Sequence, residues 1–278
     1  FLLRAPCEME FDLSAISPDP EGTTNIDPGS IAKASMLSLI SLPEDVKEKL
    51  QEVEFYNFTR QDCCPVWDKQ GTYDTKFGAI NWDTLETAKI VNDCNLGRVA
   101  VLNMANEWNC GGGFERTWGS QEEMLFRRSS IGFNLWPYRR RDDNRIPEID
   151  KDIPRRESKY PLTECGGIYS PNVVVLRNIH GYHYRSAPYE PNERYMISML
   201  SVAAQDLRYW MSHVKEEFSL ELTKEKIRTM LYMAASHNHQ CIILGAFGCG
   251  AFQNDPKLLA DIFKSILETE YKGVFRLV

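Results

Sequence analysis

The sequence predicts an α/β protein built on a layered sheet. Apolar runs of β-type residues alternate with segments of helical periodicity through the C-terminal half of the chain, a pattern typical of sheets covered by helices. With 278 residues, 43% of them hydrophobic, the chain is long enough to bury a substantial core. We expect a single domain over residues 1–278, and the sequence contains no visible internal repeat.

The N-terminal part, residues 1–50, is predicted to be a helical extension of the core. Residues 12–30 are acidic and rich in proline and glycine, which indicates an extended lead-in. An amphipathic helix with Ser30 as its N-cap is expected over residues 30–40. A second helix is expected to begin near Pro43, because a proline followed by two acids suits a first turn. Both helices are expected to pack outside the sheet.

The middle of the chain is predicted to contain the first strands. A short strand is expected near residues 55–58, followed by a helix with Asp83 at its start, and the apolar run 98–106 is typical of a buried strand. A helix is predicted over residues 121–135. The densely charged, proline-containing residues 137–167 then predict a solvated, partly disordered insertion, with a basic lid over an anionic ligand as the alternative.

Strands and helices alternate through the remainder of the chain. Strands are predicted over residues 172–177, 195–204, 241–245 and 274–278, and helices over residues 222–239 and 256–271. Periodicity alone does not separate a strand from a helix at residues 195–204.

Composition excludes several classes of function. A net charge of −7 argues against a broad basic surface for duplex nucleic acid, and no apolar run approaches the roughly 20 residues of a membrane span. The eight cysteines form no C-x-x-C pair and show no repeated spacing, which is typical of reduced thiols. We therefore expect an intracellular protein, cytoplasmic or nuclear, with neither duplex nucleic acid nor a membrane as partner.

Metal binding is not predicted. The pairs His180 and His183, and His237 and His239, have no cysteine or carboxylate at zinc-finger or zincin spacing. Polar histidines in loops or at helix ends are the favoured interpretation, and no cofactor is expected.

The most informative feature of the chain is NCGGGFERTWGSQEE, residues 109–123. The glycines Gly111–Gly113 follow the predicted buried strand, and Glu122 and Glu123 begin the next helix. Glycines accept positive φ and lack Cβ, so their amides can closely approach a diphosphate, and open α/β sheets bind ligands at this end of their strands. The alternatives are a bare turn, and glutamates that only complement the helix dipole.

A second glycine-rich loop ends another predicted strand. Residues 245–252 place three spaced glycines before an aromatic residue, which suggests a second phosphate-binding loop. A core phenylalanine is an alternative role for Phe252 and the favoured one for Phe247.

The segments LNMAN, GGG and QEE together resemble the signature of the poly(ADP-ribose) glycohydrolases, a macrodomain-type family in which GGG is followed after six to eight residues by QEE. Here residues 114–120 supply seven. The likeness is closest to the short microbial form and extends to residues 83–88, 168–171 and 244–252. It implies a macrodomain-like three-layer α/β/α sandwich with a mixed central sheet, and it favours a strand at residues 195–204.

The resemblance also implies the chemistry. Cleavage of the O-glycosidic ribose–ribose bond of poly(ADP-ribose) requires an acid for the leaving oxygen and a base for water. Glu123 is expected to serve as both, and Glu122 to hold a ribose hydroxyl. Neighbouring carboxyls that face one ligand raise each other's pKa, so the acid can keep its proton near neutral pH.

The resemblance assigns a set of residues to ADP-ribose. The loop glycines are expected to bind the diphosphate and distal ribose, Phe252 to pack on that ribose, and the asparagines to bind its hydroxyls or merely to cap a turn. The predicted substrate-binding residues are Asn103, Asn106, Gly111, Gly112, Gly113, Gln121, Gly245, Gly248, Cys249, Gly250 and Phe252.

One departure from the microbial pattern concerns the loop before Gln121. Glu115, Arg116, Thr117 and Trp118 stand where the pattern prefers small residues, and they could narrow the site against a polymer. Two alternatives to polymer cleavage therefore stay open, a phosphatase-like hydrolase of ADP-ribose 1″-phosphate and a non-catalytic ADP-ribose-binding module. ADP-ribosylated proteins are possible partners in each case.

Overall fold

The structure is a computed structural model that describes residues 27–116, 119–179, 186–208 and 217–278. The predicted lead-in before residue 27, the pair His180 and His183, and the loop residues Thr117 and Trp118 lie outside these ranges. Within the described ranges, no helix is both long and apolar enough to cross a membrane.

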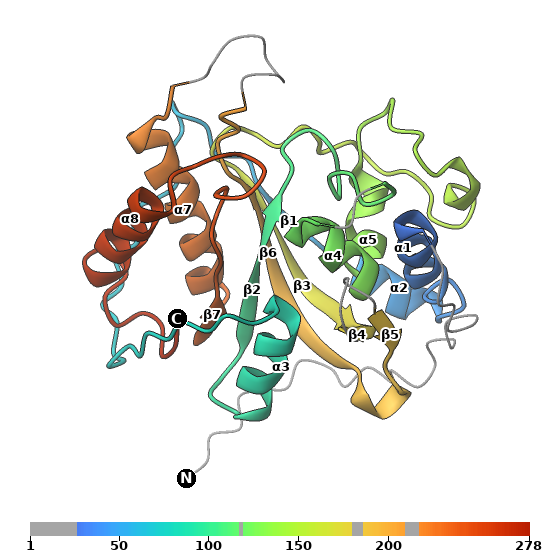
Figure 1. Ribbon diagram of the computed structural model, residues 1–278, viewed down its shortest axis with the longest axis horizontal. Helices are drawn as coiled ribbons and strands as arrows, with labels where there is room; N and C mark the ends of the chain where they lie inside the picture. Colours follow the sequence, from blue (N-terminus) through green and yellow to red (C-terminus); the bar gives the residue numbers. More distant parts are fainter. Residues whose placement is uncertain (1–26, 117–118, 180–185, 209–216) are drawn as a thin grey trace.

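A five-stranded mixed sheet forms the centre of the molecule, as predicted (Figure 1). Its strands, in spatial order, are β1 (Glu54–Tyr56), β3 (Gly167–Val175), β6 (Tyr195–Ala203), β2 (Val99–Ala105) and β7 (Cys241–Ile243). β6, β2 and β7 are parallel, whereas β1 pairs antiparallel with β3, and β3 with β6. A separate two-stranded sheet joins β4 (Arg177–Ile179) to β5 (Ser186–Pro188).

Helices cover both faces of the sheet and complete the predicted three layers (Figure 1). One face carries α7 (Leu220–Ser236) and α8 (Pro256–Glu268), and the other carries α1 (Pro28–Leu37), α2 (Glu44–Leu50), α3 (Thr84–Asp93), α4 (Gln121–Arg128) and α5 (Ile131–Leu135). The alternation of side chains along β2 supplies both cores. Val99 and Val101 pack with the α3–α5 layer, and Ala100 and Leu102 with α7 and α8.

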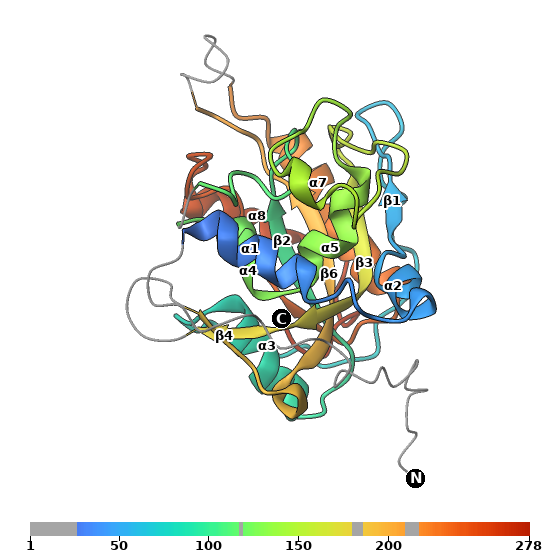
Figure 2. The same cartoon turned by 90° about the vertical axis from the view of Figure 1, so that its right-hand side faces the viewer.

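The N-terminal extension begins differently from the prediction. Asp27, rather than Ser30, caps α1, because its side chain accepts the backbone N–H of Ser30 (3.1 Å) and Pro28 suits the first turn. α1 lies against α4 (Figure 2), where the hydroxyl of Ser35 donates to the carbonyl of Arg127 (2.7 Å).

The helix predicted over residues 121–135 is broken in two. Ser129 adopts an extended backbone and bridges to β3 at Val175. Ser130 completes the junction, because its N–H donates to Val174 and its Oγ accepts the N–H of Val174. The end of β3 therefore takes up the backbone groups that a continuous helix would have used, and α4 ends at Arg128.

Two strand predictions also need correction. The strand predicted over residues 172–177 begins earlier, because β3 starts at Gly167 and passes through a register shift between Ser170 and Val173. Residues 274–278 form no strand, because Leu277 alone makes bridges, to Cys241 and to Lys76.

The charged segment 137–167 is packed against the domain, so the predicted solvated and partly disordered insertion is wrong. Its isoleucines Ile149 and Ile153 are fully buried. Arg139 is also buried, with its guanidinium 4.4 Å from the ring of Trp136 and bonded to Asp150. The buried isoleucines are spaced within a highly charged stretch. The overall composition of the segment therefore does not reveal that it contributes to the core.

Candidate active site

The loops that follow the parallel strands define the candidate active site. Residues 106–120 connect β2 to α4, residues 204–208 follow β6, and residues 244–253 follow β7. Since parallel strands end at the same edge of a sheet, these loops emerge together, where open α/β sheets hold their ligands.

Two carboxyl groups from the first turn of α4 are buried beneath the glycine loop. Glu122 and Glu123 are only 3% and 8% exposed. Glu122 accepts the backbone N–H of Asn106 at Oε2 (2.7 Å) and that of Gly111 at Oε1 (3.1 Å). Glu123 accepts the N–H of Gly113 at Oε1 (2.9 Å). The sequence assigned these glycine amides to a diphosphate, whereas here they hold the two glutamates.

Two polar atoms of predicted site residues are buried without a hydrogen-bond partner among the described residues. They are Oε2 of Glu123 and Oδ1 of Asn103. Asn103 lies inside β2 rather than in a turn, and its Nδ2 donates to Oγ of Ser201 (3.0 Å) on the neighbouring strand. Buried polar atoms are usually hydrogen-bonded, so these two oxygens are the candidates for hydrogen bonds to a ligand.

Gly112 lies directly against both carboxyl groups. A Cβ at this position would lie 2.4 Å from Oε1 of Glu123 and 3.1 Å from Oε2 of Glu122, and the backbone φ is +56°. Both the space and the left-handed conformation therefore require glycine. Gly111 also has a positive φ, +77°, and a Cβ there would lie 2.5 Å from the ring of Phe126.

Burial and the adjacent Glu123 raise the pKa of Glu122 well above its usual range. The two backbone N–H donors and the charge of Arg145 act in the opposite direction.

Gln121, the first residue of the QEE motif, joins α4 to the edge of β2. Its Oε1 accepts the N–H of Met104 (2.8 Å), and its Nε2 donates to the carbonyl of Leu102 (2.6 Å). These are the bonds that a peptide group of a parallel neighbour would make, and β7 pairs with β2 only as far as Val101. Gln121 thus takes the place of a peptide group of β7 beyond Ile243, opposite Asn103.

We expect Gln121→Glu to destabilise the fold, because a carboxylate oxygen would then face the carbonyl of Leu102. An unsatisfied buried acceptor costs about 1–3 kcal/mol, so thermal denaturation should show a clear fall in Tm. Gln61→Glu makes the same change of charge at an exposed position and should leave Tm nearly unchanged. Equal Tm values for the two variants would contradict the strand-like role of Gln121.

Asn106 organises the start of the loop. Its Oδ1 accepts the N–H groups of Trp108 (3.0 Å) and Asn109 (2.8 Å), which forms an Asx turn. Asn106 therefore caps a turn, which is one of the two roles that the sequence allowed. Asn103 instead has a side-chain oxygen, Oδ1, without a partner among the described residues.

The second glycine loop is fixed to the end of β6 by Asn254. Its Nδ2 donates to the carbonyls of Gln205 (2.8 Å) and Gly248 (3.1 Å). Gly248 has φ +72°, and a Cβ there would lie 2.5 Å from Cβ of Ala204. Sequence reasoning missed Asn254, although its place directly before the helix cap Asp255 marks it as a loop-end residue.

The remaining members of this loop have more space. A Cβ on Gly245 would make only ordinary contact, and one on Gly250 would meet nothing within 4 Å. Cys249 and Phe252 are partly buried, and the guanidinium of Arg208 lies 4.9 Å from the ring of Phe252. Phe247 is 1% exposed, which agrees with the core role that the sequence favoured.

Arg145 is the principal site residue that sequence reasoning missed. Its guanidinium donates to the carbonyls of Cys110 (2.7 Å) and Gly112 in the glycine loop. The residue belongs to a charged run interpreted as solvated. The spacing of Ile146, Ile149 and Ile153 behind it is the signal that could have indicated a packed segment.

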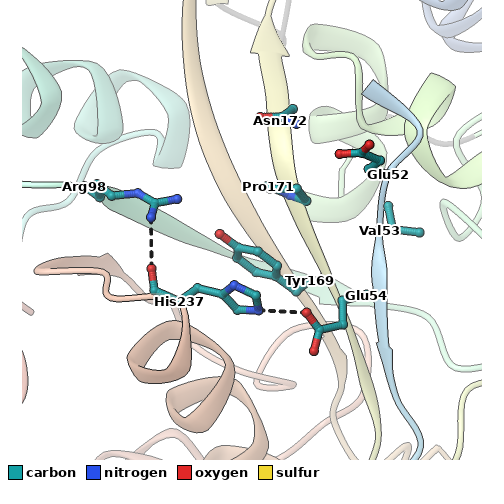
Figure 3. Close-up of a pocket in the computed structure, with 8 residues that line it drawn as sticks. All are labelled: Glu52, Val53, Glu54, Arg98, Tyr169, Pro171, Asn172 and His237. Atoms are coloured by element: carbon teal, nitrogen blue, oxygen red, sulfur yellow. Dashed lines mark hydrogen bonds and ion pairs between the residues drawn. The ribbon is translucent and has the colours of Figure 1, made fainter. Parts of the chain in front are cut away.

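A cavity of about 560 Å³ lies elsewhere, at the amino end of β2. Figure 3 shows Arg98, Tyr169 and His237 on one side and Glu54 on the other. His237 stacks on Tyr169 (ring centroids 3.7 Å apart) and its Nε2 lies 3.1 Å from Glu54. The cavity does not include the carboxyl pair, so we place the candidate active site at the opposite ends of the strands.

The two histidines near this cavity belong to the framework of the fold. Nε2 of His239 lies 2.9 Å from the hydroxyl of Tyr169, and burial lowers the pKa of His239 to about 3. Over the residues that the structure describes, no three His, Cys, Asp or Glu side chains are grouped to hold a metal ion.

Comparison with known proteins shows the family of the chain. The family model for the catalytic domain of microbial-type PARG, the poly(ADP-ribose) glycohydrolases, matches residues 29–178, more than half of the chain. No curated protein matches the sequence.

Solved structures show the same fold. Poly(ADP-ribose) glycohydrolase from Thermomonospora curvata, bound to the inhibitor ADP-HPD, is 22% identical with a TM-score of 0.64, over 90% of this chain and 91% of that one. The enzyme from Deinococcus radiodurans in complex with ADP-ribose is 23% identical with a TM-score of 0.62, over 85% and 90% of the two chains. The chain belongs to the microbial-type PARG catalytic-domain family and is, as its sequence predicted, a glycosidase-type hydrolase.

Proposed function

We propose that the chain hydrolyses the O-glycosidic ribose–ribose bond of poly(ADP-ribose) and releases ADP-ribose, with Glu123 as acid and base. The observation that carries the proposal is the buried, unpartnered Oε2 of Glu123 in a carboxyl pair held by loop amides. A proton donor needs an oxygen that is not already committed to the backbone, and Glu123 offers one.

The two glutamates have different tasks because their oxygens have different partners. Both oxygens of Glu122 accept backbone N–H groups, which fixes this carboxyl as an acceptor for a ribose hydroxyl. We assign the role of proton donor to Oε2 of Glu123, the oxygen without a backbone partner. Transfer of that proton to the bridging oxygen breaks the glycosidic bond, and the resulting carboxylate takes a proton from the water that attacks the anomeric carbon.

The ligand class follows from the relatives, whose structures contain ADP-ribose or the inhibitor ADP-HPD. We assign the unpartnered Oδ1 of Asn103 to a ribose hydroxyl and Phe252 to packing on the distal ribose. Gly245 and Gly250 are assigned to close approach of the diphosphate, because packing within the described residues does not require glycine at either position. ADP-ribosylated proteins in the cytoplasm or nucleus are the proposed wider partners.

Incubation with poly(ADP-ribose), and separately with ADP-ribose 1″-phosphate, tests this function. We expect chromatography to detect ADP-ribose released from the polymer. Release of phosphate from the small substrate alone would favour the phosphatase-like alternative. Binding of ADP-ribose without turnover of either substrate would favour a non-catalytic module.

A further inference from the structure

Arg145 contacts the glycine loop on the side opposite the glutamates. Its guanidinium donates to the carbonyl oxygens of Cys110 (2.7 Å) and Gly112. These carbonyls belong to the same two peptide groups whose N–H groups, on Gly111 and Gly113, donate to the carboxyls.

A peptide group is planar, with its C=O and N–H pointing in opposite directions. Fixing the carbonyl oxygen therefore fixes the direction of the N–H group. Two hydrogen-bonded chains result, from Arg145 through one peptide to Glu122 and through the other to Glu123. A cation at one end and a carboxyl at the other polarise each peptide in the same sense.

We infer that Arg145 is a positioning residue for the reaction, orienting both carboxyl groups through these two peptide groups. The inference rests on the proposed function of the carboxyl pair. Arg145 touches neither Glu122 nor Glu123 in any described hydrogen bond, so its effect is indirect.

The guanidinium is itself held in place. Nε and Nη2 of Arg145 donate to the two oxygens of Asp143 (2.9 Å and 2.7 Å), and Nη1 lies 3.1 Å from Glu115. The group also lies over the rings of Phe114 (5.1 Å) and Trp136 (5.6 Å). A planar fork of five donors can meet these partners together, whereas the single ammonium of a lysine cannot.

Three variants test the inference. Arg145→Lys keeps the charge but not the fork, and Arg145→Gln removes both. Arg140→Gln is the matched control, because Arg140 lies in the same segment and its side chain pairs with the exposed Asp142.

We expect kcat to fall about 100-fold in both Arg145 variants with KM within a few-fold, since misplacement by about 1 Å can cost that much. The control should match the unaltered protein. The charge of Arg145 lowers the pKa of Glu122. Its loss in Arg145→Gln should therefore raise the pKa of Glu122 and shift the limb of the pH–rate profile that depends on Glu122 to higher pH, whereas Arg145→Lys should leave that limb in place. If Arg145 had a purely structural role, both variants would lower Tm, and their pH–rate profiles would not differ from each other.

Hydrogen exchange of the Gly111 and Gly113 amides gives a readout that needs no substrate. We expect both amides to lose protection in the Arg145 variants and to keep it in the control. This distinguishes failure of the positioning role from failure of the proposed function, which the unaltered protein reveals by not cleaving the polymer. If Arg145→Gln does not fold, the kcat and the amide protection of Arg145→Lys test the inference. Unchanged kcat and unchanged amide protection in Arg145→Lys would overturn the inference.

Discussion

Glu123→Gln will remove turnover of poly(ADP-ribose) while the protein stays folded. Glutamine keeps the oxygen that accepts the N–H of Gly113 and places its NH2 group where the unpartnered Oε2 was. The proton donor is lost, and one positioned acid or base contributes roughly 10²–10⁴-fold. Single-turnover assays should show a fall of at least this size, with ADP-ribose affinity by calorimetry within a few-fold of the unaltered protein.

Glu122→Gln is the informative comparison. Both oxygens of Glu122 accept backbone N–H groups, so the new NH2 group must face a donor from either Asn106 or Gly111. We expect a loss of about 1–3 kcal/mol in the free energy of unfolding, whereas Glu123→Gln should keep the Tm of the unaltered protein. Full activity in Glu123→Gln would exclude Glu123 as the acid. Equal losses of Tm in Glu122→Gln and Glu123→Gln would contradict the different tasks proposed for the two glutamates.

Gly112→Ala will be nearly as damaging, although it removes no chemical group. The added Cβ would lie 2.4 Å from Oε1 of Glu123, and the residue has φ +56°. The loop must therefore move away from the carboxyl pair, which separates Gly113 from Glu123. A displacement of this kind should lower kcat by about 100-fold or more.

Gly119→Ala is the matched control in the same loop. A Cβ on Gly119 would meet nothing within 4 Å, so kcat should stay within a few-fold of the unaltered protein. Comparable losses in the two variants would indicate that the loop is sensitive to alanine in general, and would remove the special role of Gly112.

The sequence predicted the layered fold and the residues of the carboxyl pair because both depend on local patterns. Strand and helix periodicity identified β2 and α7, the family resemblance favoured the strand β6, and the GGG and QEE blocks located the glutamates. The partners of those groups could not be predicted in the same way. Arg145 is separated from Gly112 by 33 residues, and nothing in a charged run indicates which arginine turns inward.

Competition between partners explains the other differences. Ser129 and Ser130 could have continued a helix, but the end of β3 offered their backbone groups an alternative. The N–H groups of Gly111 and Gly113 were expected to bind a diphosphate. In the structure they donate hydrogen bonds to the carboxyl groups of Glu122 and Glu123, at the start of the following helix. Which of two possible hydrogen-bond partners is used depends on which segments lie together in the folded protein. The sequence does not show this arrangement directly.

The attachment of α4 at both ends limits how the site can open. Gln121 ties its first residue to β2, and Ser130, just beyond its last residue, ties it to β3. A helix anchored to two strands of one sheet cannot swing on a hinge as a rigid body without breaking hydrogen bonds at one end. The loop after β2 is constrained as well, because its N–H groups on Asn106, Gly111 and Gly113 bind the two glutamates. We therefore expect the motion that admits a substrate in the loop after β7, on the timescale of loops rather than of domains. Entry and release would then leave Glu122, Glu123 and the amides that bind them in place.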